Sequence, residues 1–524
     1  MGIFVISRVI PRTYHDSVRL MRVSEELSNL GSVNKVFVAM GTDANKRVLD
    51  QVGLLTDSIK QSGANDLTIV VEAESNSAAE SALLQAEDIL KRNNEENNSE
   101  LEEFHPRNFE EAYKSFNDAN VLFLSVPGPY AALEAAKALN ANMNVMIFSD
   151  NVPIEDELTL KKLAVKKGLL LMGPGCGTAV INGIALGFAN VLEKGPVGIV
   201  GASGTGIQEL TTLLDRMGIG VSQVIGVGGR DLSDYIGGIM MSQGITKLTS
   251  DPSTEVIVLI SKPPDITVTP KILKEAIASN KPIIVNFMGE NTISKQEGVV
   301  FTENIEDTAE AVFTLIGKGT GPFLSTSSET LREMAKNEGS KLAKDQKYIR
   351  GLFCGGSLCD EAIDILGKHF KGIYSNVAVT KEWKLENGQI SKQHSCIDMG
   401  EEEFTLSRPH PMIDTSLRHD RILREASDSS VAVILLDVVI GYGSHESPAS
   451  SLAEAIIKAK QNAAKNKNYL SVVTHVCGSK KDPQGVEGQE EILRNVGALV
   501  LPTNAQAAKV AAAILGADLN RGVI

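Results

Sequence analysis

The sequence is poor in aromatic residues and in positive charge. Aromatic residues make up 5% of its 524 positions, too few to line a groove that stacks nucleic-acid bases. Lys and Arg number 51 against 65 Asp and Glu, which gives a net charge of −14. A chain this acidic is a poor binder of polyanions. We therefore expect no nucleic-acid partner.

Cysteine is also scarce. An odd number of cysteines, five in a long chain, is unlike the disulfide framework of a secreted protein and indicates a reducing compartment. Two of them, Cys354 and Cys359, have no companion Cys or His pair at zinc spacing. We interpret these two as buried packing residues and expect no metal site.

Signals for export or membrane insertion are missing. The apolar run at the N-terminal end is short and is followed by Arg8, which does not fit a signal peptide. Residues 168–192 carry no charge and are long enough to span a bilayer. They contain six glycines, Pro174 and two asparagines, which a lipid-facing helix does not accommodate. We expect a cytoplasmic protein with no membrane span.

The sequence contains a regular alternation of predicted strands and predicted helices. Short apolar or β-branched runs alternate with helical patterns, which is typical of parallel α/β sheets, and the helix predicted over residues 207–217 has one apolar face. The length predicts about three to four domains. The predicted strands cover residues 35–40, 67–71, 121–126, 144–148, 197–200, 256–260, 282–287, 431–439 and 469–476.

Composition changes divide the chain into three expected domains, 1–194, 196–318 and 348–524. Residues 317–346 mix Gly, Ser, Thr and alternating charge, and we interpret them as a solvated, partly helical connection. Residues 91–103 are polar and charged, and we interpret them as a surface loop inside the first domain.

Two glycine-rich turns each join a predicted strand to a predicted helix. Backbone N–H groups at a helix start lack intrahelical acceptors and bind anions, so two such turns suggest one phosphate site shared by neighbouring domains. The alternative is a pair of tight turns, with Ser203 acting only as a helix cap. The spacing fits neither nucleotide motif, G-x-x-x-x-G-K-[ST] or G-x-G-x-x-G. The candidate phosphate-binding residues are Ser203, Gly204, Thr205, Gly206, Gly355, Gly356 and Ser357.

A proline-stiffened loop over residues 408–414 contains two further candidates. Arg408 suits a bidentate clamp on a carboxylate or phosphate, and His410 suits donation to a developing oxyanion. An ordinary turn with a solvated histidine is the alternative.

Two other polar residues follow predicted strands. Asp437 lies near the end of an apolar strand, so it either receives backbone hydrogen bonds or faces the ligand crevice at the strand ends. Arg230, in a glycine-rich loop, is either an anion partner or half of a surface turn with Asp231.

Several segments carry a family resemblance. They are MGPGCGT (172–178), GASGTGIQEL (201–210), GGRDL (228–232), RPHPMID (408–414) and LDVVIG (436–441). Together they resemble the FdrA family, relatives of the succinyl-CoA synthetase α and β chains, over essentially the whole chain. The resemblance implies a Rossmann-like, CoA-binding-like first domain and two flavodoxin-like domains, similar to the synthetase α chain and the C-terminal part of the β chain. It also implies that the two helix starts clasp a phosphate group, as they clasp a phosphohistidine in the synthetases.

The chain departs from the synthetases at two places. Residues 288–292, after a predicted strand, contain no histidine, so no phosphoenzyme is expected. Residues 7–14 stand where the synthetase CoA site has a glycine-rich turn. No cofactor is therefore required, and binding of CoA or a nucleotide is the alternative.

Members of the FdrA family are implicated in anaerobic allantoin breakdown as the large subunit of an oxamate carbamoyltransferase, which works with separate subunits. The resemblance therefore implies an oligomer that converts oxalurate and phosphate to oxamate and carbamoyl phosphate. Arg230, Arg408 and His410 would orient the substrate, and the two turns with Asp437 would bind phosphate. An acyl-CoA ligase subunit and a non-catalytic scaffold are the alternatives.

Overall fold

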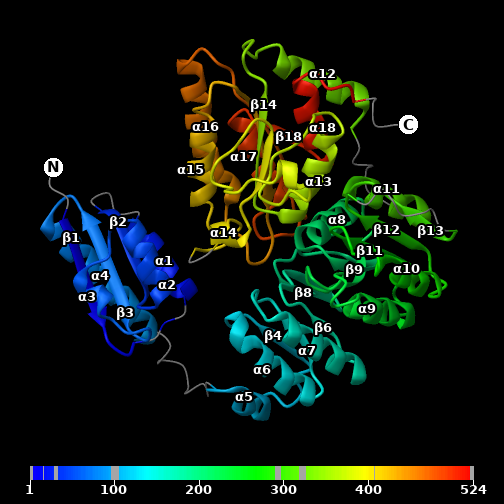
Figure 1. The fold of residues 1–524 in the computed structure, drawn as a ribbon, viewed down its shortest axis with the longest axis horizontal. Coiled ribbons are helices and arrows are strands. Elements are labelled where there is room, and N and C mark those ends of the chain that lie inside the picture. The colour runs from blue at the N-terminus through cyan, green and yellow to red at the C-terminus, as the bar shows by residue number, and fades with distance from the viewer. Residues whose placement is uncertain are drawn as a thin grey trace. The chain divides into compact units, whose positions relative to one another are not determined.

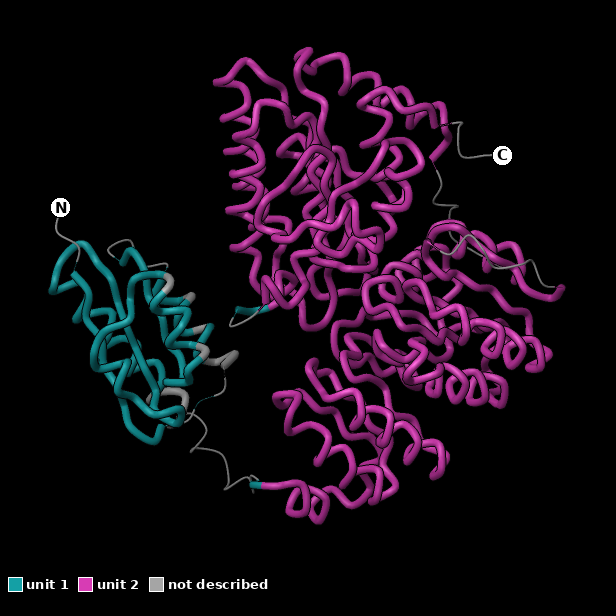
Figure 2. Tube along the Cα trace, in the orientation of Figure 1, with its two compact units in different colours: residues 1–107, 406–409 teal, residues 108–405, 410–524 magenta. Residues whose placement is uncertain are grey.

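The computed structural model describes residues 4–13, 15, 17–28, 33–95, 106–289, 297–317, 326–405 and 408–519. Contacts divide the chain into two compact units (Figure 2): residues 1–107 with 406–409, and residues 108–405 with 410–524. Within the described ranges, no helix combines the length and the apolar character needed to cross a membrane.

The first unit is an antiparallel sheet covered by helices. Its strands run in the order β1-β3-β2, and both neighbouring pairs are antiparallel. Leu20 and Leu27 of α1 pack with Leu83 of α4 in the core of this unit. The elements are β1 (Phe4–Ile10), α1 (Ser17–Ser28), β2 (Val33–Met40), α2 (Asp43–Gln51), α3 (Asp57–Lys60), β3 (Leu67–Ala73) and α4 (Asn76–Glu95).

The expected Rossmann-like domain over residues 1–194 is therefore wrong for its first half. The hydrophobic pattern of a strand identifies its buried face but not the direction of its neighbour. Residues 91–95 end helix α4, and residues 96–105 lie outside the described residues. The first unit ends at Arg107, directly after that segment.

The second unit begins with a small parallel sheet of order β4-β5-β6. This sheet is the parallel part of the expected first domain. Alanines of α6 and Leu160 of α7 are buried with its strands. The elements are α5 (Phe109–Ser115), β4 (Val121–Leu124), α6 (Gly128–Asn140), β5 (Asn144–Ile147), α7 (Ile154–Lys166) and β6 (Leu171–Met172).

A seven-stranded sheet follows, in the order β13-β12-β11-β9-β10-β7-β8. Its first five strands are parallel, and the β7–β8 hairpin adds two antiparallel strands at one edge. The elements are β7 (Thr178–Ile181), β8 (Ile184–Gly187), β9 (Lys194–Ala202), α8 (Gly204–Arg216), β10 (Val221–Gly226), α9 (Ile239–Ser250), β11 (Val256–Ser261), α10 (Thr269–Ile277), β12 (Ile283–Phe287), β13 (Val299–Phe301) and α11 (Ile305–Ile316).

The last sheet has five parallel strands in the order β15-β14-β16-β17-β18. All nine residues of β16 are buried, as expected for a central strand covered on both faces. Helix α12 (Ser328–Gly339) precedes the sheet, within the predicted connection. The other elements are β14 (Tyr348–Phe353), α13 (Gly356–Gly367), η2 (Lys381–Trp383), β15 (Ser395–Asp398), α14 (Glu402–Thr405), α15 (Ser416–Glu425), β16 (Val431–Val439), α16 (Pro448–Lys465), β17 (Ser471–Cys477), α17 (Val486–Asn495), β18 (Leu499–Leu501) and α18 (Asn504–Ile514).

The two larger sheets share one hydrophobic core. A single buried cluster contains Leu210 of α8, Leu358 of α13 and Val510 of α18, and α13 packs directly on α8 (Figure 1). The predicted α/β class with parallel sheets is confirmed. The shared core brings the starts of α8 and α13 together.

Candidate functional site

The two glycine-rich turns predicted from the sequence lie against each other. Ser203, the N-cap of α8, donates a hydrogen bond of 2.7 Å to the hydroxyl of Ser357 in the first turn of α13. The Ser357 N–H donates to Thr205 Oγ1 at 3.2 Å. Gly206 permits this approach, because a methyl group there would clash with the Ser203 hydroxyl and lie 3.3 Å from Ser357 Cβ.

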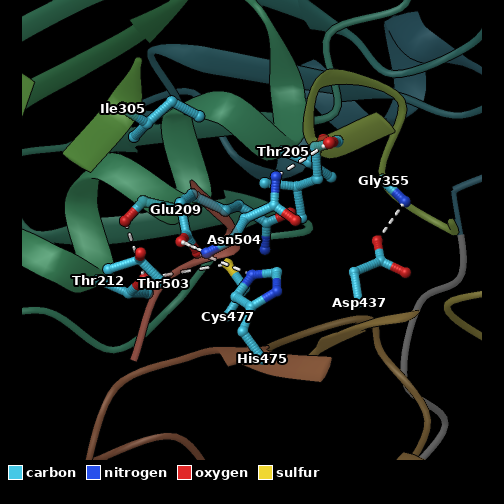
Figure 3. A network of polar contacts seen from close by, with 12 residues as sticks. Thr205, Glu209, Thr212, Ile305, Gly355, Asp437, His475, Cys477, Thr503 and Asn504 are labelled. Carbon is cyan, nitrogen blue, oxygen red and sulfur yellow. Dashed lines mark hydrogen bonds and ion pairs between the residues drawn. The ribbon is translucent and has the colours of Figure 1, made fainter. Parts of the chain in front are cut away.

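The start of α13 is occupied by the protein's own side chains. The N–H groups of Cys354 and Gly355 donate to the Asp437 carboxylate at 2.9 and 2.7 Å, and Figure 3 shows the bond from Gly355. The Ser357 N–H donates to Thr205. The expectation that these amides are free for phosphate is therefore wrong at this turn. Asp437, on the neighbouring strand β16, takes the place of the expected anion.

Asp437 is held in place by a buried arginine. The Arg418 guanidinium lies 3.0 Å from Asp437 Oδ1 and also donates to the carbonyl oxygens of Leu352 and Asp437. Asp437 is fully buried and Arg418 almost so. Of the two alternatives for Asp437, backbone hydrogen bonds and exposure to the crevice, the structure shows the first. The expected role of Asp437 in phosphate binding is incompatible with these contacts.

The start of α8 differs from the start of α13 in the partners of its amides. Among the described residues, no side chain accepts a hydrogen bond from the N–H groups of Gly204, Thr205 or Gly206. These are three of the amides that a helix start leaves without intrahelical acceptors, and the helix dipole adds positive potential there. Of the two turns, only the one at the start of α8 therefore has amides without a side-chain acceptor among the described residues, and phosphate binding there stays a prediction.

A cluster of charged residues that no sequence motif predicted lies beside this junction. Lys262 follows strand β11, and its ammonium lies 2.9 Å from Asp360 Oδ2 of α13. Asp398 ends strand β15, and its Oδ1 accepts the Gly400 N–H at 2.8 Å. A methyl group at Gly356 would lie 2.5 Å from Asp398 Oδ2 and 3.4 Å from Lys262 Nζ. Both charged groups therefore flank the first turn of α13.

The two charged groups differ in how their surroundings affect protonation. Burial raises the pKa of Asp398 to about 7, against the opposing effect of Lys262. Burial lowers the pKa of Lys262, but the nearby carboxylates of Asp360 and Asp398 outweigh it, and the net pKa is raised. The cluster therefore pairs a permanent cation with a carboxyl group that titrates near neutral pH.

His410 lies near the same cluster. Its Nδ1 accepts the Met412 N–H at 3.2 Å, so the proton of the neutral imidazole is on Nε2. Burial lowers the pKa of His410 to about 4, which keeps the ring neutral. A methyl group at Gly400 would lie 2.7 Å from His410 Nε2 and 3.1 Å from Asp398 Oδ1. The N–H donor of His410 thus faces the loop that carries Asp398.

The two candidate arginines have other surroundings. Arg230 lies 2.8 Å from Glu157 of α7 and donates to the Val152 carbonyl, and none of its contacts with described residues joins it to α8 or α13. The sequence suggested that Arg230 is either an anion partner or part of a surface turn with Asp231. The ion pair with Glu157 was expected in neither case. Arg408 is exposed, and the division of the chain groups it with the first unit. The roles of both arginines stay predictions.

A buried polar network joins the two larger lobes, one built on the seven-stranded sheet and one on the five-stranded sheet (Figure 3). It includes residues of α8 and α13. Glu209 of α8 lies 3.3 Å from His475 Nε2 of β17, and its carboxylate also accepts the Asn504 N–H. Asn504 donates to Glu361 of α13 at 2.7 Å. Burial lowers the pKa of His475, but the neighbouring Glu209 outweighs it, so the net pKa of His475 is raised. The network links helices from both lobes.

The missed residues had a signal in the sequence. Lys262 directly follows an apolar strand, and Asp398 ends another, the place where parallel sheets bind ligands. The same rule predicted Asp437 and Arg230, but not these two residues. Which strand ends meet at one site depends on the strand order of two sheets, which the sequence pattern leaves open.

Three family models match separate parts of the chain. A model described as AllF, heavy metal-associated domain, matches residues 4–106, a CoA binding domain matches residues 193–289, and a CoA-ligase model matches residues 352–514. The CoA-binding match thus falls on the lobe that contains α8, and not on the first domain as expected. The free amides at the α8 start suit an anionic phosphate of the kind that CoA carries.

The first domain does not fit a thiolate metal site, despite the name of its model. Residues 4–106 contain no cysteine, and soft metals select thiolate ligands. Across the described parts of the chain, no group of three or more His, Cys, Asp or Glu side chains is placed to hold a metal ion.

Individual relatives extend these matches. The chain is 43% identical to the YahF protein of Escherichia coli (strain K12) over 493 residues, 94% of each chain. It is 30% identical over 191 residues to the mitochondrial succinate–CoA ligase [ADP-forming] subunit alpha-2 of Trichomonas vaginalis, 35% of this chain and 60% of the relative. Among solved structures, ATP citrate lyase from Methanothrix soehngenii with citrate and coenzyme A is 12% identical, with 78% of this chain and 83% of that chain covered and a TM-score of 0.34. The chain therefore belongs to the family of YahF, a family related to succinyl-CoA synthetase α subunits, and carries an AllF-type N-terminal domain.

Proposed function

We propose that the chain is the large subunit of an oxamate carbamoyltransferase, which converts oxalurate and phosphate to oxamate and carbamoyl phosphate. The observation that carries this proposal is the α8 start, whose amides have no side-chain acceptor among the described residues, in a chain whose residues 288–292 contain no histidine to phosphorylate. No histidine occurs between residues 106 and 368. A phosphate site of this kind suits direct attack by phosphate on an acyl-type carbon.

Sequence similarity supports the same assignment. The first domain matches a model named for AllF, and the motifs of the chain resemble the FdrA family, which is implicated in allantoin breakdown. Curated relatives of the α-like lobe are named as subunits, which agrees with a chain that works with separate partner subunits.

The proposed mechanism uses no covalent intermediate. The N–H groups of Gly204, Thr205 and Gly206 bind phosphate at the α8 start. Lys262 adds positive charge beside them, which favours two anionic substrates in one site. The Nε2–H of His410 donates to the carbonyl oxygen of the ureido group as negative charge develops there. Arg230 and Arg408 are the candidates for orienting the substrate carboxylate, through the bidentate contacts that a guanidinium makes.

The test is phosphorolysis of oxalurate by the chain purified together with its partner subunits. We expect carbamoyl phosphate to form with phosphate and oxalurate and not when either is omitted. A complex that binds both substrates but forms no carbamoyl phosphate would contradict the proposal. The double variant S203A/R408A serves to separate catalysis from a scaffold role, because a scaffold keeps its activity in that variant.

An acyl-CoA ligase subunit is the second candidate, favoured by the CoA-binding match over residues 193–289. Calorimetric titration of the complex with CoA distinguishes the two. Heat of binding that disappears on addition of excess phosphate would place CoA at the same helix start and favour the ligase.

A further inference from the structure

The two carboxylate oxygens of Asp398 have different surroundings. Its Oδ1 is engaged by the Gly400 N–H, whereas its Oδ2 accepts no hydrogen bond from any described residue. Oδ2 lies against Gly356, one residue from the Ser203–Ser357 junction. Gly356 matters here, because any larger side chain would fill the space beside that oxygen.

We infer that Asp398 is the catalytic acid and base of the proposed carbamoyl transfer, donating a proton to the leaving nitrogen and receiving one from phosphate. The inference rests on the proposed function. Asp398 lies outside the sequence motifs that carry the family resemblance. The inference gives a chemical role to the cluster of Lys262, Asp360 and Asp398.

The chemistry needs such a group. A phosphate oxygen forms a bond to the ureido carbon of oxalurate, and the bond from that carbon to the oxamate nitrogen breaks. The electron pair leaves with nitrogen, and an amide anion is too basic to leave without a proton. Protonated Asp398 supplies that proton, and its carboxylate then takes the proton of hydrogen phosphate. The products are oxamate and carbamoyl phosphate, with no net proton released.

Some groups around Asp398 favour its protonated form, and others favour its carboxylate form. Burial and the nearby Glu401 and Asp360 favour the neutral acid, while Lys262 and the Gly400 N–H favour the carboxylate. These opposing influences leave its pKa at about 7, which suits a group that gives and takes a proton in one cycle. Neutral His410, on the far side of Gly400, contributes no charge.

The experiment compares the wild-type complex with the variant D398N. Asparagine keeps an oxygen for the Gly400 N–H, so we expect the fold to be retained and kcat to fall by about 10²- to 10⁴-fold, with KM for phosphate unchanged. The matched control is D364N, on the same helix as Asp360, where the carboxylate pairs with Lys368 at 3.5 Å. We expect wild-type kcat in that variant.

A second measurement uses the chain by itself. Infrared difference spectra of wild type minus D398N should show a protonated carboxyl band that disappears as pH rises through about 7. A carboxylate band at every pH would overturn the inference, as would an active complex whose kcat is unaffected by D398N. A wild-type complex with no phosphorolysis would overturn the proposed function and the inference with it, so the two failures are distinguishable.

Discussion

Ser203 and Ser357 share a hydrogen bond of 2.7 Å although they lie 154 positions apart in the chain. Ser203 caps α8, which follows a strand of the seven-stranded sheet. Ser357 lies in the first turn of α13, which follows a strand of the five-stranded sheet. The bond therefore marks the place where the seven-stranded and five-stranded sheets, with their helices, meet. The free amides of α8, Lys262, Asp398 and His410 all belong to the segments around this junction.

We expect an alanine at Gly206 to disrupt the contact between the two helix starts, and an alanine at Gly204 to be tolerated. A methyl group at Gly206 would clash with Ser203 Oγ, whereas one at Gly204 has only Thr178 Oγ1 within reach, at 4.0 Å. We expect G206A to break the Ser203–Ser357 bond, to lower stability by about 1 to 3 kcal/mol and to abolish most of the phosphorolysis activity. G204A should keep both. Thermal denaturation and the oxalurate assay test the pair, and equal behaviour of the two variants would contradict the geometry of the junction.

Asp437 is expected to be important for stability. D437N leaves the buried Arg418 without its counter-charge and removes an acceptor of two amides, so we expect a loss of about 3 to 5 kcal/mol in the free energy of unfolding. The matched control is D420N on α15, whose side chain is 87% exposed and whose replacement should change stability by less than about 0.5 kcal/mol. Urea denaturation measures both. A loss below about 1 kcal/mol for D437N would show that the buried pair is not needed.

Glu361 is expected to make stability depend on pH. Burial raises its pKa from an ordinary 4.5 to about 7, so the folded protein holds a proton that the unfolded chain releases. The contribution of this group is complete below about pH 4.5 and is lost as pH rises through about 7, by up to about 1.4 kcal/mol per pH unit.

The variant E361Q tests that sign. Glutamine cannot ionise, but its amide replaces one of the two oxygens that accept the Ile305 N–H and the Asn504 amide. We expect the variant to be less stable than wild type at about pH 5, with the difference shrinking by about pH 8. E382Q, at an exposed position, should follow wild type at both pH values. A difference that grows with pH would contradict the raised pKa.

His410 is expected to act as a neutral donor. H410A removes the Nε2–H, so we expect kcat to fall by about 10²- to 10³-fold. Because the pKa of His410 is lowered to about 4, the pH profile of the wild type should show no limb from this residue near neutrality. H419A, on helix α15 of the same lobe, is the control and should keep wild-type kcat. If the limb near neutral pH were lost in H410A and kept in D398N, the titrating group would be His410, and the expectation of a neutral donor would be wrong.

Several features of the site were predictable from local sequence. The strand over residues 431–439 was predicted with its observed bounds, because a long apolar run suits only a central parallel strand. The two helix starts were predicted for an equally local reason: small residues between an apolar strand and an amphipathic helix permit a tight turn. The α/β class and the family resemblance rest on the same local patterns.

Other features required contacts between distant residues. The direction of β1 and β3, the occupation of the α13 start by Asp437, 83 positions from Cys354, and the approach of Lys262 to Asp398 all depend on which strands are neighbours. The amino-acid sequence by itself determined the long apolar strands, the two turns and the lack of a histidine over residues 288–292, because these depend on residues close together in the chain. Only the tertiary structure decided which amides stay free and which carboxyl keeps its proton, because burial and hydrogen-bond partners come from other strands and helices: Asp437 lies 83 positions from Cys354, and Thr205 lies 152 positions from Ser357.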